Sequence, residues 1–155
     1  DSIWRTQNLS NINTEGYEIN SVINTKSILF MPFSTLSINY AFNESDTTSE
    51  GFQSAYVLDH LKSKFSLIAS QDINNIRLDW RTSFQEREGE YIDFESGQQT
   101  EYLPFWLVSL KVSYSISQKS KFFIEVNNLL NENYVDFGNV PQPGRWIRLG
   151  TKINL

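Results

Sequence analysis

Apolar and polar side chains alternate one residue at a time through most of this 155-residue chain. The pattern is clearest over residues 76–87, where Ile76, Leu78, Trp80 and Phe84 alternate with charged and polar side chains. Successive side chains of a β-strand point to opposite faces, so the pattern predicts strands with one apolar and one polar face. Helical periodicity is scarce, and we therefore expect an all-β fold.

The same alternation predicts six further strands, and the first dozen residues have room for an eighth. The six strands lie at residues 17–24, 36–42, 61–70, 106–116, 121–127 and 145–155. Leu61 is expected on the apolar face of its strand, together with Phe65 and Leu67. Six aromatic residues are expected near strand ends, where they would form an aromatic girdle: Tyr40, Phe42, Trp80, Trp106, Tyr114 and Phe122.

The connections between the predicted strands alternate in length. Short polar turns lie at residues 24–27, 71–75 and 117–120, and long loops lie at residues 43–60, 89–104 and 131–143. Counted back from the C-terminus, the long loops fall at one end of the sheet and the short turns at the other. Outer-membrane barrels have this asymmetry, and their strands of about ten tilted residues match the hydrocarbon thickness. We therefore favour a transmembrane barrel over a β-sandwich, which would show the same alternation.

Composition excludes several classes of site and partner. The chain has no cysteine, so disulfides, thiolate metal sites and a cysteine nucleophile are excluded. The net charge is −5 and the basic residues are scattered, which gives no basic face for nucleic acid. No apolar run approaches the ~18 residues of a spanning helix, and the first residues lack the pattern of a signal peptide. We expect the chain to be a segment of a longer protein.

Charged side chains of the polar face would line the interior of a barrel. They are Arg77, Asp79, Arg81, Arg87, Lys111, Glu125 and Arg148. The candidates for binding an anionic substrate are Arg77, Arg81 and Arg87, because guanidinium groups pair with carboxylates and phosphates. Loop aromatics could stack on a ligand or pack the loops together: Tyr91, Phe94, Tyr102, Phe105, Tyr134 and Phe137.

Six carboxylates crowd one predicted loop: Glu86, Glu88, Glu90, Asp93, Glu95 and Glu101. Such a cluster could hold Ca²⁺, but the spacing is not that of an EF-hand, and we favour a solvated acidic loop. We therefore predict no metal site and no cofactor. An enzyme is a competing class because His60 follows Asp59. Adjacent residues of a strand point to opposite faces, so we do not expect catalysis.

The last thirty residues carry a two-part motif. Its first part is Asn128, Leu129, Leu130, Asn131 and Tyr134, and its second part is Pro141, Gln142, Pro143, Gly144 and Arg145. The segment resembles the C-terminal segment of TonB-dependent outer-membrane receptors. Residues 8–19, with Gly16 and Glu18, and residues 56–67 show weaker similarity to the same family. The chain ends on Leu155, where these receptors usually end on an aromatic residue.

The resemblance implies an arc of a large barrel. Outer-membrane transporters of this kind have 22 strands and a plugged lumen, so seven or eight strands would be the C-terminal third. Residues 1–155 would then be one barrel segment without its plug domain and N-terminal strands. We expect that such a segment does not close into a barrel by itself, because its curvature belongs to a wider one.

The resemblance also implies a function, which is transport rather than catalysis. Such receptors lie in the outer membrane of Gram-negative cells, in contact with its lipid. They bind a scarce nutrient outside, such as an iron chelate, cobalamin or a glycan, and import it with energy from the TonB complex. The plug domain and the TonB complex would be the protein partners. The alternative is a complete eight-stranded outer-membrane barrel with a structural or adhesive role.

Overall fold

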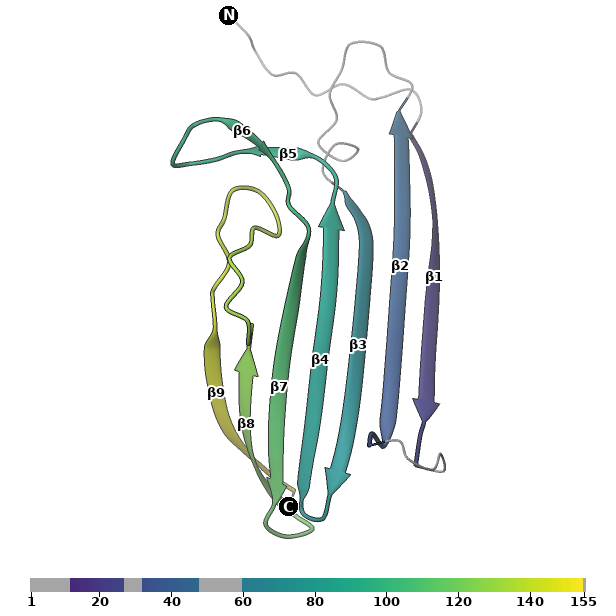
Figure 1. The fold of residues 1–155 in the computed structure, drawn as a ribbon, viewed down its shortest axis with the longest axis vertical. Coiled ribbons are helices and arrows are strands. Elements are labelled where there is room, and N and C mark those ends of the chain that lie inside the picture. Colours follow the sequence, from purple (N-terminus) through teal and green to yellow (C-terminus); the bar gives the residue numbers. More distant parts are fainter. Residues whose placement is uncertain (1–11, 27–31, 48–59, 155) are drawn as a thin grey trace, which may run out of the picture.

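The computed structural model describes residues 12–26, 32–47 and 60–154 of the chain. Its main element is one antiparallel sheet of seven strands in the order β1-β2-β3-β4-β7-β8-β9 (Figure 1). The strands are β1 (Ile12–Asn24), β2 (Thr35–Thr47), β3 (Leu61–Ile73), β4 (Ile76–Arg87), β7 (Phe105–Ser115), β8 (Ser120–Asn127) and β9 (Trp146–Ile153). Two short strands, β5 (Glu90–Ile92) and β6 (Gln99–Glu101), form a separate hairpin. The predicted antiparallel meander is confirmed.

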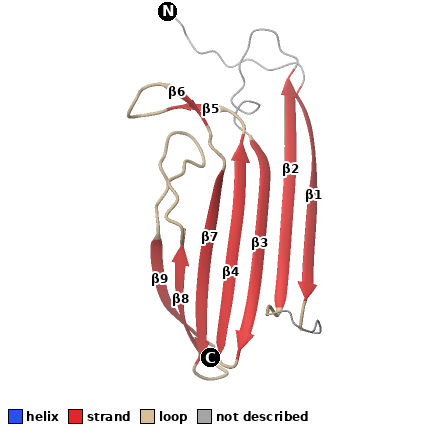
Figure 2. Ribbon diagram, viewed as in Figure 1, coloured by secondary structure: helices blue, strands red, loops and turns tan. Residues whose placement is uncertain are grey.

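The described residues are strands, turns and loops (Figure 2). No helix in this part of the chain is long and apolar enough to cross a membrane. The outer strands of the sheet are β1 and β9, which do not pair with each other. The seven described strands therefore form an open sheet.

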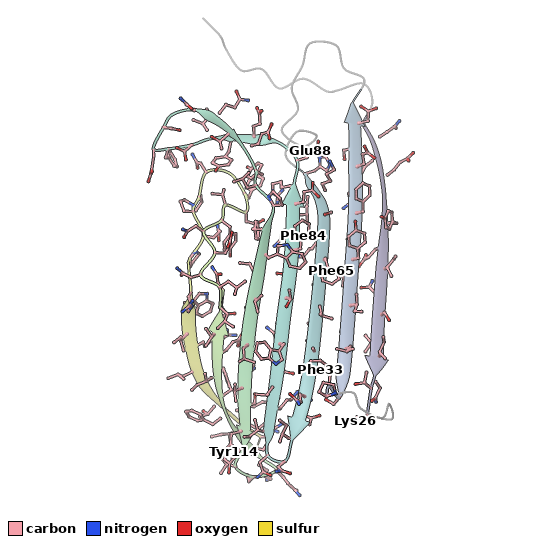
Figure 3. All side chains as sticks on the ribbon, viewed as in Figure 1. Lys26, Phe33, Phe65, Phe84, Glu88 and Tyr114 are labelled. Carbon is pink, nitrogen blue, oxygen red and sulfur yellow. The ribbon has the colours of Figure 1, made fainter. Side chains whose placement is uncertain are left out.

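The pairing register keeps the two faces of the sheet separate. On the apolar face, Tyr40 lies opposite Phe65, Phe65 opposite Phe84, and Phe84 opposite Trp106. Phe65 and Phe84 lie side by side near the upper part of β3 and β4 (Figure 3). A register slip of one residue would move every side chain of a strand to the other face. From β1 to β9, the pairing of neighbouring strands keeps the apolar side chains on the same side of the sheet, so the apolar face is continuous.

Much of this apolar face is exposed rather than packed into a core. Ile19 is 57% exposed, Ile147 is 65% exposed and Leu149 is 62% exposed. The buried hydrophobic residues in the described part of the chain are Ala69, Tyr102 and Phe105, each 6% exposed. An exposed apolar surface of this extent needs a cover, such as another protein surface or lipid.

The predicted sorting of loops holds for the connections that the structure describes. The β5–β6 hairpin and the β8–β9 loop lie at the upper end of the sheet, while the β3–β4 and β7–β8 turns lie at the lower end (Figure 1). The predicted long loop at residues 89–104 contains the β5–β6 hairpin, a difference from the prediction. Residues 48–59 of the predicted loop at residues 43–60 lie outside the described residues. Of the first dozen residues, where an eighth strand was expected, residues 1–11 also lie outside them, and Ile12 begins β1.

Four local predictions were wrong. Residues 43–47 belong to β2 rather than to the predicted loop at residues 43–60, because they pair with residues 12–16 of β1. Residues 71–73 belong to β3 rather than to a turn, because Ile73 pairs with Ile76 and leaves only two residues to reverse the chain. The register shifts beside Leu61, which therefore lies opposite Arg87 of the polar face. Trp80 in β4, and Tyr40 and Phe42 in β2, lie at least four residues from either end of their strands and cannot belong to a girdle at the strand ends. Tyr114 does lie at the lower end of β7 (Figure 3).

Candidate functional site

A row of alternating charges crosses the polar face of four neighbouring strands. Asp79 lies opposite Lys111, Lys111 opposite Glu125, and Glu125 opposite Arg148. Opposite charges directly across from each other on one face stabilise strand pairing. This row therefore helps to set the register of β4, β7, β8 and β9.

Arg77 lies at one end of this row, where carboxylates of the same sheet bind its guanidinium group. Its Nε donates to Asp79 at 3.0 Å, and its Nη1 donates to Asp72 at 3.2 Å. The hydroxyl of Ser70 donates to Asp79 at 2.6 Å and accepts from Arg77 Nη2 at 2.9 Å. Arg77 thus has its charge and several of its donors matched within the sheet.

Glu125 is the buried centre of the row. Only 2% of the residue is exposed, and Arg148 Nη2 donates to its carboxylate at 2.6 Å. Arg81 Nη1 lies 3.6 Å from the other carboxylate oxygen. The Lys111 ammonium lies over the ring of Phe123, 4.3 Å from its centre. That ring covers Gly150, where an added Cβ would come within 2.5 Å of it.

Arg87 occupies a different place, where two outer loops meet. Its Nε donates to the backbone carbonyl of Asp136 at 2.6 Å, and its guanidinium lies 5.2 Å from the ring centre of Phe137 and 5.9 Å from that of Tyr102. The hydroxyl of Tyr102 accepts from the backbone N–H of Gly138 at 2.8 Å. Arg87 and Tyr102 therefore tie the loop after β4 to the loop between β8 and β9.

The loop aromatics pack in two pairs. Tyr91 and Tyr102 lie 5.0 Å apart between ring centres, and Tyr102 is buried. Phe105 and Tyr134 lie 4.4 Å apart, and Phe105 is buried. Burial, with a smaller contribution from the nearby Asp136 charge, raises the pKa of Tyr134. Phe94 and Phe137 are 78% and 61% exposed, so these two rings are the ones open to solvent.

Two carboxylates of the acidic loop, Asp93 and Glu88, bind neighbouring groups of the protein. Asp93 accepts from the backbone N–H of Ser96 at 2.7 Å, from its hydroxyl and from the N–H of Glu95, and these bonds lower the pKa of Asp93. Glu88 pairs with Lys62 at 3.1 Å, near the upper end of the sheet (Figure 3). In residues 12–26, 32–47 and 60–154 no three metal-ligating side chains form a group that could hold a metal ion. Asp59 lies outside the described residues, so the expectation that Asp59 and His60 do not act together stays a prediction.

The motif residues of the last loop form a network of hydrogen bonds. Asn128 is buried, and its side-chain amide donates to the carbonyls of Glu132 at 2.8 Å and Pro143 at 3.3 Å. Its Oδ1 accepts from the backbone N–H of Glu132 at 2.9 Å. Asn131 accepts from the backbone N–H of Arg145 at 2.8 Å. This hydrogen-bond network therefore joins both ends of the loop between β8 and β9.

The backbone conformations and contacts of the motif residues agree with this hydrogen-bond network. Asn128 and Asn131 have φ values of 49° and 58°, a conformation that Asn tolerates better than most residues. A Cβ on Gly144 would lie 2.7 Å from the Asn131 side chain, which explains the glycine. Leu129 donates its backbone N–H to Val108, and Pro141 forms an isolated bridge with Val135. The motif thus has a structural role in closing the loop.

The six predicted ligand-binding residues do not form a single site. Arg87, Tyr91 and Tyr102 lie together at the upper end. Arg77 and Arg81 lie on the polar face of β4, and Tyr134 packs on Phe105.

The sequence analysis missed Asp136 as the partner of Arg87. The alternation shows the face on which a side chain lies, but it carries no signal for contacts between loops.

Comparisons with known proteins add a structural relative. No family model matches the chain, and a search of curated proteins found no match. Among solved structures, the chain is similar to the closed form of the ferric-catecholate import receptor Fiu of E. coli K12, with a TM-score of 0.71 and 16% identity. The chain shares the fold of part of that receptor. The match covers 92% of this chain and 21% of the receptor, so the chain spans about a fifth of the receptor's length.

We predict that Asn128→Ala loosens the loop between β8 and β9. The change leaves two backbone carbonyls and one backbone N–H without their partner, at about 1–3 kcal/mol for each buried group left unsatisfied. Limited proteolysis of the full protein in detergent should cut within residues 128–145 at least about tenfold faster. The control is Asn133→Ala in the same loop, whose side chain is exposed. Equal cleavage rates in the two variants would contradict the structural role of the motif.

We also predict that Arg87→Gln uncouples the two outer loops. The variant loses the ion pair with Asp136 and the stacking on Tyr102 and Phe137. Spin labels on Gln98→Cys and Val140→Cys should report a narrow distance distribution that broadens in the variant, and residues 1–155 add no cysteine of their own to the labelling. Glu132→Gln, an exposed change in the same loop, should leave the distribution unchanged. An unchanged distribution in Arg87→Gln would show that other contacts hold the loops together.

Proposed function

We propose that the chain is a segment of the barrel wall of a TonB-dependent outer-membrane transporter. The observation that carries the proposal is the open seven-stranded meander with one apolar and one polar face, which has the fold of part of an import receptor. An open sheet with unpaired outer strands is suited to continue into a larger barrel, because closure removes exposed strand edges. The C-terminal motif supports the same family.

In this function the two faces have different surroundings. The apolar face lies against lipid, which covers side chains such as Ile19, Ile147 and Leu149. The polar face lines the lumen, where the plug domain and water can satisfy its charges. Energy for import comes from the TonB complex through the plug, and neither partner belongs to residues 1–155.

We propose an iron chelate as the substrate to test first, because the structural relative is a ferric-catecholate import receptor. Arg87, Tyr91 and Tyr102 are the predicted binding residues that lie together at the outer end. A guanidinium group and aromatic rings can together bind an anionic, aromatic ligand. Arg77 is a weaker candidate than Arg87, because two carboxylates, Asp72 and Asp79, match its charge, whereas Arg87 pairs with the single carboxylate of Asp136.

The other candidate functions lack a supporting observation. A complete small barrel would need β9 to pair with a strand near the N-terminus, and β1 does not pair with it in the described sheet. An enzyme would need a set of groups placed for chemistry, for which the described residues give no specific support. Transport is therefore the one function that we propose.

The orientation in the membrane is tested with single cysteines in the full protein. Gln98→Cys lies at the end with the long loops, and Gln118→Cys lies in the turn between β7 and β8. In intact cells we expect a membrane-impermeant maleimide to label Gln98→Cys and to leave Gln118→Cys unlabelled until the outer membrane is permeabilised. Labelling of both sites in intact cells would contradict the proposed orientation.

Transport is tested in the same cells by disruption of the gene. We expect the uptake of at least one labelled iron chelate to be lost, and the same uptake to stop when the TonB complex is inactivated. If gene disruption changes the uptake of no iron chelate, cobalamin or glycan, the transport proposal fails even where the orientation is correct.

A further inference from the structure

We propose that the outward side of the β5–β6 hairpin is a docking surface for a basic segment of a partner protein. On this surface, which we call the hairpin face, two carboxylates and two exposed apolar side chains lie close together. Its members are Glu90, Ile92, Phe94, Gln99 and Glu101. The proposal rests on the proposed function for its location outside the cell, because the hairpin lies at the end of the sheet with the long loops (Figure 1).

The hairpin has one side toward the protein and one side that no described element covers. Tyr91 lies opposite Thr100, both are half-buried, and the Tyr91 ring packs on the buried ring of Tyr102. Side chains alternate between the two faces of a strand, so the other residues of β5 and β6 point the opposite way. All of these residues are exposed. The hairpin therefore presents a sheet face without a partner among the described residues.

Two apolar side chains of the hairpin face are largely exposed. Ile92 is 64% exposed and Phe94 is 78% exposed, and they are two residues apart in the chain. The hairpin lies beyond the upper ends of β4 and β7 (Figure 1), so in the proposed orientation both side chains lie outside the lipid. Exposed apolar side chains that lie together among polar ones mark sites of protein interaction. Another protein surface is thus the cover that these two side chains lack.

The carboxylates of the hairpin face have no matching charges. Glu90 lies directly opposite Glu101, and like charges in this position destabilise the pairing of two strands. Gln99 donates a hydrogen bond to Glu90 but brings no charge. Among the described residues neither glutamate forms an ion pair, whereas Glu88 pairs with Lys62. A cationic group of a partner would remove the repulsion between the two carboxylates.

The negative charge extends over the whole connection between β4 and β7. Residues 88–104 contain no lysine, arginine or histidine, and their five carboxylates belong to Glu88, Glu90, Asp93, Glu95 and Glu101. A surface with charges of one sign attracts partners of the opposite sign and speeds their association. The charge of this connection therefore selects a partner segment with Lys or Arg side chains.

The same charge disfavours the other occupants of an exposed apolar surface. A second copy would bring the same acidic connection, and like charges that face each other oppose binding. An anionic lipid surface would be repelled for the same reason. No metal-ligating group of three side chains exists in residues 12–26, 32–47 and 60–154. A small organic cation would leave Ile92 and Phe94 in water, so a basic polypeptide segment with apolar residues fits the surface best.

Contacts inside the hairpin hold the hairpin face in one conformation. Asp93 accepts from the backbone N–H and the hydroxyl of Ser96, at 2.7 Å and 2.8 Å. The backbone N–H of Asp93 donates to the carbonyl of Gln98 at 2.9 Å. A surface that is already ordered loses less conformational entropy when it binds a partner. The hairpin is therefore suited to binding without a large rearrangement.

The first test places a photoreactive benzophenone side chain at the position of Ile92 in the full protein in living cells. We expect irradiation to give an adduct with a second protein, whose crosslinked peptide carries Lys or Arg next to the crosslink. The same side chain at the position of Gln118, in the turn at the other end of the sheet, should not capture this protein. The proposal is overturned if no adduct forms, or if the adduct joins another loop of the same protein, a second copy, lipid or a segment without basic residues.

The second test compares two matched pairs of glutamates. Glu90→Gln with Glu101→Gln removes the charges of the hairpin face, and we expect the yield of the adduct to fall at least about tenfold. The control is Glu15→Gln with Glu44→Gln, because these exposed glutamates also lie opposite each other near the upper end of their strands. Both variants should migrate as folded barrels on unheated gels. An equal yield in the two folded variants would overturn the role of the hairpin carboxylates.

The purified complex in detergent distinguishes a basic partner from a metal bridge. Salt screens exposed charges, so we expect the Kd of the captured partner to rise at least about tenfold between about 0.05 M and about 0.5 M NaCl. Addition of EDTA should leave the Kd unchanged. A complex that EDTA dissociates would contain a bridging metal ion, and the basic segment would then be wrong.

Failure of this proposal is distinguishable from failure of the proposed function. If Ile92 captures no partner while gene disruption abolishes the uptake of an iron chelate, only the docking surface is wrong. If a basic partner is captured while gene disruption changes no uptake, transport is wrong and the docking surface stands.

Discussion

The register of the cross-strand hydrogen bonds is the constraint on which the rest of the structure depends. The register of the neighbouring strands places many apolar side chains opposite apolar ones, as with Phe84 and Trp106. It also places several charges opposite charges of the other sign, as with Glu125 and Arg148. Because side chains alternate with a period of two, one slip would place Glu125 among the apolar side chains. The buried carboxylate and the aromatic pairs therefore stabilise the same register from the two faces.

The ends of the sheet depend on hydrogen bonds of a different kind. At the upper end, the last loop is closed by Asn128 and Asn131, and it is tied to the β5–β6 side by Arg87 and Tyr102. At the lower end, short turns need few such contacts, and two residues connect β3 to β4. The sheet therefore has short turns at one end and loops held together by hydrogen bonds at the other.

The alternation of side chains was enough to predict the strands and their two faces, because it depends only on the chain's own sequence. It could not predict the shift at Leu61, the extra strand residues after Gln71 or the β5–β6 hairpin, since these depend on which residues lie opposite each other. The candidate site was predicted less well. Arg81 and Arg148 are far apart in the sequence, and only the pairing of β4, β7, β8 and β9 brings them to one carboxylate.

The most direct measurement is a scan of solvent exposure along β4 in the full protein in lipid. Spin labels would be placed one at a time at residues 76–87, and collision rates with oxygen and with a water-soluble nickel complex would be measured. We expect a period of two, with oxygen collisions highest at Ile76, Leu78, Trp80, Thr82 and Phe84, because these positions face the hydrocarbon. Rates without this alternation, or low oxygen collisions at the apolar positions, would contradict a sheet whose apolar face lies in the membrane.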